Sequence, residues 1–156
     1  KSDAEKNKLR NNLEKIKIEG IFDFNSNILI VGLGSIGLLM GQAAKNMGYK
    51  PFGIDLLQER ADLAKKMGFE NAFVLLDDIE DIVSDMKLEV NANGFDAVIM
   101  TSGSDSAIPL AVDAVRDGGT INVFSSLSSV FKKDKAATEI NSAIIITDFV
   151  SFCIAL

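Results

Sequence analysis

A glycine-rich turn directly after a short apolar run constrains the fold of this chain more than any other feature. Residues Ile28 to Val31 are apolar, and Gly32 to Gly37 read Gly-Leu-Gly-Ser-Ile-Gly before a segment with helical spacing. This is the G-x-G-x-x-G pattern in the strand–turn–helix setting that binds dinucleotides. The first glycine permits a tight turn, the second lets a pyrophosphate approach the backbone, and the third lets the helix pack closely on the strand. We therefore predict a phosphate-binding turn at Gly32, Gly34 and Gly37, where free amides and the helix dipole favour an anion.

An acidic residue at the end of the next apolar run supports this interpretation. Tyr49 to Ile54 reads as a short strand, and Asp55 follows it, 23 residues after Gly32. This distance is close to the spacing of about 20 residues at which an acid binds the adenosine ribose hydroxyls. We predict that role for Asp55. The alternative is an ordinary strand-to-helix turn that binds no nucleotide.

Apolar runs and helical patterns alternate along most of the chain. Such alternation predicts parallel strands joined by helical crossovers, an α/β fold with a doubly wound parallel sheet of the Rossmann type. The predicted strands are 28–31, 51–54, 72–75, 95–100 and 120–124, and the predicted helices are 35–47, 57–67, 77–87 and 105–116, the last closed by Gly118 and Gly119.

We expect two parts in the chain. Residues 1–22 form an N-terminal helical segment, because Ser2 to Lys17 has helical spacing, and residues 23–156 form the dinucleotide-binding domain. Ile140 to Ile154 is rich in β-branched residues and predicts one or two further strands.

Composition excludes several classes of function. The net charge of −6 and the lack of a basic stripe argue against a nucleic-acid partner. No apolar run reaches the roughly 18 residues of a membrane span, so we expect no membrane partner. Cys153 is the single cysteine, which suits a cytoplasmic location. The chain has no histidine, so a zinc site built from His and Cys is excluded within it, as is a Ser–His or Cys–His catalytic pair.

From Ile28 to about Phe124 the chain resembles the cofactor domain of the medium-chain dehydrogenase/reductases, the family of zinc-type alcohol and polyol (sorbitol-like) dehydrogenases. Several independent motifs agree with that family in order and spacing. They are Val31-Gly-Leu-Gly-Ser-Ile-Gly37, Gln42-Ala-Ala-Lys45-Asn-Met-Gly48, Gly53-Ile-Asp55, Leu63-Ala-Lys-Lys-Met-Gly68, Gly94-Phe-Asp96-Ala-Val-Ile and Gly118-Gly119.

The resemblance implies a nicotinamide cofactor and contacts for each part of it. Asp55 would accept both adenosine ribose hydroxyls and repel a 2′-phosphate, so NAD is favoured over NADP. The other implied contacts are Gly32, Gly34, Ser35, Ile36 and Gly37 at the pyrophosphate, Arg60 near adenine, Thr101 and Ser102 beside a ribose, and Phe124 and Ser125 at the nicotinamide half. A solvated helix position for Arg60 and plain strand-end turn chemistry for Thr101 and Ser102 remain alternatives, and we interpret Asp77 as a surface residue.

The same resemblance implies that the catalytic part lies elsewhere. Relatives carry the zinc ligands and the proton relay in another domain, which precedes the cofactor domain and resumes after it. We therefore interpret this chain as an excised or truncated cofactor domain of an NAD-dependent dehydrogenase, inactive alone, with zinc only in the missing catalytic domain. The alternative is an intact natural protein that has lost its catalytic half. The stretch from Glu139 to Cys153 resembles strands that pair across a dimer, so we expect a homo-oligomer through residues 140–154.

Other functions share the glycine turn. A non-enzymatic NAD-sensing regulatory module uses the same turn and acid and stays open as the alternative. A methyltransferase that uses S-adenosylmethionine is disfavoured, because the third glycine is placed for a dinucleotide. The short-chain dehydrogenases need a Tyr-x-x-x-Lys pair, whereas Tyr49, the only tyrosine, has Gly53 four residues later in place of the lysine.

Overall fold

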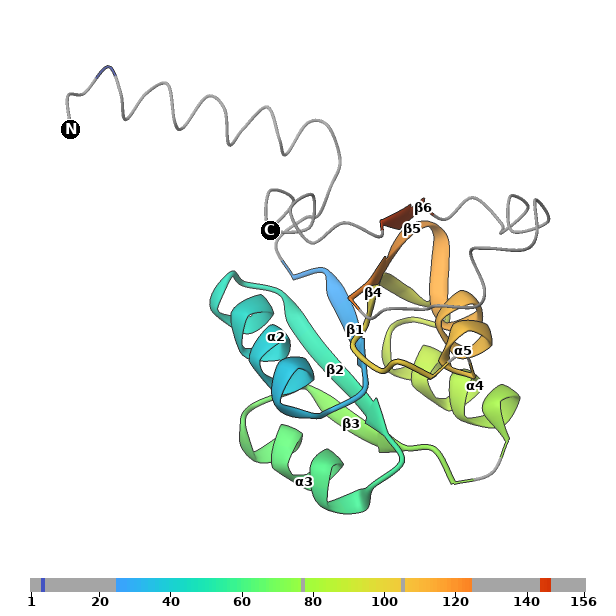
Figure 1. Ribbon diagram of the computed structural model, residues 1–156. Helices are drawn as coiled ribbons and strands as arrows, with labels where there is room; N and C mark the ends of the chain where they lie inside the picture. Colours follow the sequence, from blue (N-terminus) through green and yellow to red (C-terminus); the bar gives the residue numbers. More distant parts are fainter. Residues whose placement is uncertain (1–3, 5–24, 77, 105, 125–143, 147–156) are drawn as a thin grey trace.

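The strands form one parallel sheet with helices on both of its faces (Figure 1). The computed structural model describes residues 4, 25–76, 78–104, 106–124 and 144–146. Within these ranges the sheet has six strands in the order β3-β2-β1-β4-β5-β6. The strands are β1 (Asn27–Val31), β2 (Lys50–Asp55), β3 (Asn71–Val74), β4 (Phe95–Met100), β5 (Val115–Val123) and β6 (Ile144–Ile146). The predicted doubly wound α/β fold is confirmed.

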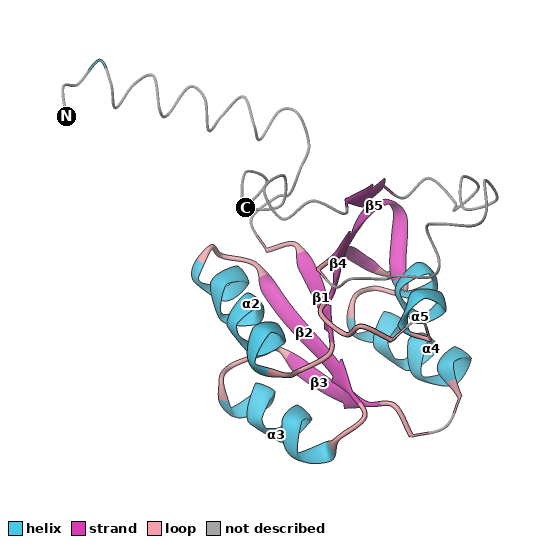
Figure 2. Cartoon of the chain, viewed as in Figure 1, coloured by secondary structure: helices cyan, strands magenta, loops and turns pink. Residues whose placement is uncertain are grey.

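Helices cover the two faces in pairs (Figure 2). The helices are α2 (Ser35–Asn46), α3 (Gln58–Lys66), α4 (Ile79–Glu89) and α5 (Ala107–Ala114). Helices α2 and α3 pack on one side of the sheet, and α4 and α5 pack on the other. The chain runs outward from β1 to β3 and then returns to β4 on the other side of β1. That reversal is the switch point at which ligands bind to sheets of this kind, at the carboxyl ends of the strands.

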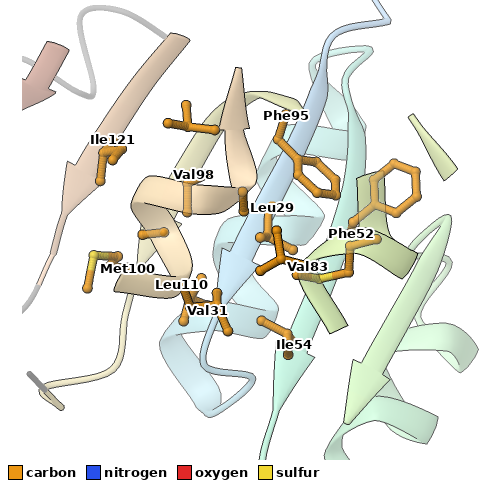
Figure 3. Packing of buried hydrophobic residues seen from close by; sticks show 14 of the residues in the cluster. Leu29, Val31, Phe52, Ile54, Val83, Phe95, Val98, Met100, Leu110 and Ile121 are labelled. Carbon is orange, nitrogen blue, oxygen red and sulfur yellow. The ribbon is translucent and has the colours of Figure 1, made fainter. Parts of the chain in front are cut away.

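The alternation of side chains along β1 explains why this strand reads as a continuous apolar run. Leu29 and Val31 belong to the apolar layer under α4 and α5, whereas Ile28 and Ile30 belong to the layer under α2 and α3. All four are buried. A strand covered on both faces needs apolar residues at every position. Figure 3 shows the first of these layers, in which the rings of Phe52 and Phe95 meet edge to face.

The prediction that a helix extends to Arg116 is wrong. Helix α5 ends at Ala114, and Val115 already begins β5, where it pairs with Phe95 of β4. The glycines that were expected to close the helix lie within β5, near the point where the register between β4 and β5 shifts. Pairing with β4 decides this boundary, because Val115 pairs with Phe95, and the bond from Arg116 Nε to Asp96 Oδ1 at 2.7 Å adds a partly exposed contact.

The described residues cover only some of the remaining predictions. Strand β6 confirms one further strand in the β-rich stretch 140–154, and it pairs in parallel with β5. The helix predicted over Ser2 to Lys17 lies outside the described residues apart from Ala4, and Asp77 and Ser125 lie outside them as well. In the part of the chain that the structure describes, no helix is long and apolar enough to cross a bilayer.

Candidate functional site

The glycine turn between β1 and α2 is held from both sides by neighbouring strands. Gly32 has φ +96°, a backbone conformation that residues with a side chain rarely adopt. Its N–H donates to the carbonyl of Ile54 on β2 at 2.9 Å. Its carbonyl accepts from the Thr101 hydroxyl, at the end of β4, at 2.8 Å. The turn is therefore fixed to the carboxyl ends of the strands on either side of β1.

The other two glycines of the motif differ in their surroundings. A Cβ atom on Gly37 would lie 1.9 Å from the Gly32 carbonyl oxygen, so only glycine lets α2 approach the turn this closely. A Cβ atom on Gly34 would meet no atom of the described residues within 4 Å. Gly34 therefore leaves open space next to the backbone, as a ligand that approaches the turn requires.

Within the described part of the chain, no acidic or capping side chain occupies the start of α2. Gly34 is the N-cap, no described side chain caps the helix, and the first turn contains no acidic residue. The amide groups of a helix start point along the axis and carry the positive end of its dipole. This end of α2 can therefore bind a phosphate group.

The Asp55 carboxylate lies beside the turn and is almost buried, with 6% of its side chain exposed. Oδ2 accepts from the Leu33 N–H at 2.7 Å, and Oδ1 accepts from the Leu57 N–H at 3.0 Å. Arg60 approaches Oδ2 at 3.4 Å, and its own side chain is 46% exposed. A carboxylate accepts about four hydrogen bonds, so Oδ1 keeps an acceptor position for a ligand, and the long Arg60 contact is the one that a ligand displaces most easily.

A pocket of about 330 Å³ joins these parts. Eight of the residues expected from the sequence line it, namely Gly32, Gly34, Ile36, Gly37, Asp55, Arg60, Thr101 and Ser102. Two others do not line it. Ser35 is exposed at the start of α2, and Phe124 follows β5, where its N–H donates to the Met100 carbonyl at 2.9 Å.

Sequence reasoning missed the apolar and hydroxyl-bearing walls of the pocket. These come from the segments after β2, β3 and β4 and from α5, and they comprise Leu56, Leu75, Ser104, Ser106, Ala107 and Leu110. Carboxyl ends of neighbouring parallel strands meet at one edge of the sheet. Leu75 is the last residue of the predicted strand 72–75 and Leu56 lies two residues beyond the predicted strand 51–54, so nearness to a strand end was a usable signal for both, although no motif marks them.

The donor set does not fit a zinc site. The described residues contain no group of three His, Cys, Asp or Glu side chains that could hold a metal ion. The chain as a whole has no histidine and one cysteine. The arrangement is instead suited to a ligand with a phosphate group, vicinal hydroxyls and an apolar ring.

Comparisons with known proteins place this chain in a family. A family model described as zinc-binding dehydrogenase matches residues 35–148. Alcohol dehydrogenase 1 of Trifolium repens is 36% identical over 112 residues, which is 71% of this chain and 28% of that protein. L-threonine 3-dehydrogenase of Aliivibrio fischeri is 35% identical over 99 residues, which is 62% of this chain and 28% of that protein. The chain thus spans less than a third of these two relatives.

A solved structure shows the same fold. A mycobacterial protein in complex with NADPH superposes with a TM-score of 0.70 over 84% of this chain and 40% of its own, at 16% identity. At this identity the likeness concerns the fold alone. The match of the family model to most of the chain carries the assignment. The chain belongs to the zinc-binding dehydrogenases of the medium-chain dehydrogenase/reductase family, and it corresponds to their cofactor domain.

Proposed function

We propose that this chain binds NAD(H) as the cofactor domain of a zinc-type alcohol or polyol dehydrogenase. One observation carries the proposal: the nearly buried Asp55 carboxylate lies in the same pocket as the open side of Gly34 and the uncapped start of α2. A dinucleotide needs these features together, a donor-rich turn for its pyrophosphate and an acceptor for its ribose hydroxyls.

The residues would divide the cofactor among them. The amides of Ser35 and Ile36 at the start of α2 would donate to the pyrophosphate, next to the bare backbone of Gly34. Asp55 would accept from the adenosine ribose. Arg60, Thr101 and Ser102 would lie near the adenosine half, and Phe124 and Ser125 would lie toward the nicotinamide.

Charge supports NAD rather than NADP. Asp55 would face the 2′-position of the ribose, and an anion there repels a 2′-phosphate. Among the residues that the structure describes, Arg60 stands against this, since its guanidinium lies 3.4 Å from Asp55 and neutralises part of the charge. The mycobacterial protein of related fold is in complex with NADPH, which supports a nicotinamide cofactor for this chain and does not distinguish NAD from NADP.

The activity of the whole enzyme would be hydride transfer between an alcohol carbon and the nicotinamide. This chain would bind and orient the cofactor, and the zinc of a separate catalytic domain would polarise the alcohol oxygen. The proposal also includes the division into a helical segment at 1–22 and a cofactor domain at 23–156. It further includes a homo-oligomer through residues 140–154, around β6, and a cytoplasmic location suited to a single cysteine.

A titration with NADH and NADPH tests the proposal through Asp55→Ala. The loss of hydrogen bonds to a charged acceptor, worth about 1.5–3 kcal/mol, should weaken NADH binding roughly 10- to 100-fold. The preference for NADH over NADPH should fall as well. Asp62→Ala is the matched control, because Asp62 is exposed on α3 and its carboxylate accepts from Gln58 outside the pocket. Equal NADH affinity of Asp55→Ala and the wild type would show that Asp55 does not bind the ribose.

A further inference from the structure

One peptide group connects the glycine turn with the ribose-binding acid. The carbonyl of Gly32 and the N–H of Leu33 belong to the same peptide unit. The Thr101 hydroxyl donates to that carbonyl at 2.8 Å, and Asp55 Oδ2 accepts from that N–H at 2.7 Å. Because a trans peptide is planar and its C=O and N–H point in opposite directions, fixing one end fixes the other.

The Thr101 hydroxyl is used for the hydrogen bond to the Gly32 carbonyl. It has one proton, and the Gly32 carbonyl at 2.8 Å is closer than its second acceptor, the Val31 carbonyl at 3.2 Å. The residue is only partly exposed, and its Oγ1 would lie 3.0 Å from a Cβ atom on Gly32 or on Gly37. The hydroxyl therefore occupies the space that two glycines of the motif leave open.

Leu33 keeps the Gly32–Leu33 peptide near Asp55. The Leu33 side chain is fully buried, and it packs on Gly53 of β2, where a Cβ atom would meet Leu33 Cδ2 at 2.7 Å. Gly32, by contrast, has the conformational freedom of glycine. When the hydroxyl is absent, the peptide between them can rotate, because the freed carbonyl has lost its side-chain donor and Gly32 offers little resistance.

We propose that Thr101 is a positioning residue that orients the Asp55 carboxylate through the Gly32–Leu33 peptide. This inference rests on the proposed function, because it assigns Thr101 the control of how Asp55 receives the ribose. Rotation of the peptide would remove the Leu33 donor from Oδ2, and of the contacts that the structure describes, those with Leu57 and Arg60 would remain. Recognition of the ribose hydroxyls would weaken while the pyrophosphate half of the site kept its donors.

The test measures, in the full chain, the ratio of the affinity for NADH to the affinity for NADH that lacks the adenosine 2′-hydroxyl. Thr101→Val removes the hydroxyl and keeps the shape, and it should reduce this ratio about fivefold, the effect of one hydrogen bond. Thr101→Ser restores the hydroxyl and should restore the ratio. Thr120→Val is the matched control, since Thr120 lies on β5 and does not line the pocket.

A double-mutant cycle separates positioning from a merely structural role. In the Asp55→Ala background, Thr101→Val should change the ratio no further, because the two residues act through one peptide. Additive effects of the two substitutions, or a ratio that Thr101→Val leaves unchanged, would overturn the proposal. A wild-type chain that does not bind NADH would instead overturn the proposed function.

Hydrogen exchange of the Leu33 amide provides a readout that needs no cofactor. In Thr101→Val this amide should exchange at least about fivefold faster than in the wild type, because its hydrogen bond to Asp55 is weakened. Thr101→Ala replaces Thr101→Val if the valine variant does not fold. An unchanged Leu33 exchange rate in a folded variant without the hydroxyl would overturn the proposal.

Discussion

Replacing Gly34 and Gly37 separately with alanine should separate cofactor binding from folding. The two residues lie three positions apart in one turn, yet a methyl group meets open space at Gly34 and the Gly32 carbonyl oxygen, at 1.9 Å, at Gly37. A backbone carbonyl cannot move aside as a flexible side chain can. The same substitution should therefore have a different effect at each position.

The magnitudes follow from these contacts. Gly37→Ala overpacks the turn and should lower the free energy of unfolding by about 1–3 kcal/mol. For a chain of this size that corresponds to a fall in Tm of roughly 3–10 °C. At Gly34, alanine is a poorer N-cap by about 0.5–1 kcal/mol, but it restricts the unfolded chain by a similar amount. The stability of Gly34→Ala should therefore stay within about 0.5 kcal/mol of the wild type.

NADH affinity should be reduced more by Gly34→Ala than by Gly37→Ala. The Gly34 methyl group would occupy the space next to the helix amides and prevent their charge-assisted hydrogen bonds to the pyrophosphate, which lowers NADH affinity roughly 10- to 100-fold. Thermal unfolding and NADH titration by fluorescence measure the two effects. Gly103→Ala is the matched control, because Gly103 also has open space but does not line the pocket. Wild-type NADH affinity in Gly34→Ala would show that the cofactor does not need the space at Gly34. Wild-type stability in Gly37→Ala would show that the close approach at Gly37 is not needed for folding.

Two further predictions concern stability. Gly41→Ala should lower the free energy of unfolding, measured with denaturant, by about 1–3 kcal/mol, because its Cβ atom would meet the buried ring of Phe69 at 1.9 Å. The smaller side chain of Phe69→Leu in the same chain should recover part of this loss. An equal loss in the double variant would show that the contact with Phe69 does not cause it. Arg116→Ala should cost at most about 1 kcal/mol, because its ion pair with Asp96 is partly exposed; a loss of several kcal/mol would mean that the pair, rather than strand pairing, holds the start of β5.

The alternation of strands and helices was predictable because burial on both faces leaves a direct mark on the sequence. The strand Phe95–Met100 was predicted with the bounds that the structure has, and its apolar residues are buried in both layers. The end of α5 was not predictable in this way. Val115 and Arg116 continue a helical pattern locally, and only their contacts with Phe95 and Asp96 make them extended.

The site was predictable in its positions but not in its connections. Spacing along the chain indicated that Asp55 and the glycine turn meet at one edge of the sheet. It did not indicate that Asp55 accepts from Leu33, 22 residues away, or that the Thr101 hydroxyl reaches the turn from 69 residues away. Those bonds depend on side-chain directions that the sheet sets. The Ser104 and Ser106 wall likewise has no local pattern that separates it from an ordinary loop.

Amide chemical shifts followed during a titration with NADH test whether the chain binds the cofactor at the glycine turn. We expect saturable shifts at the start of α2 from Gly34 to Gly37, at Asp55 and at Ser102, since these residues lie at or beside the same pocket. The exposed residue Leu88, on α4, should not shift. No saturable shift at millimolar NADH, or shifts confined to surfaces away from the glycine turn, would show that the cofactor does not bind at this turn.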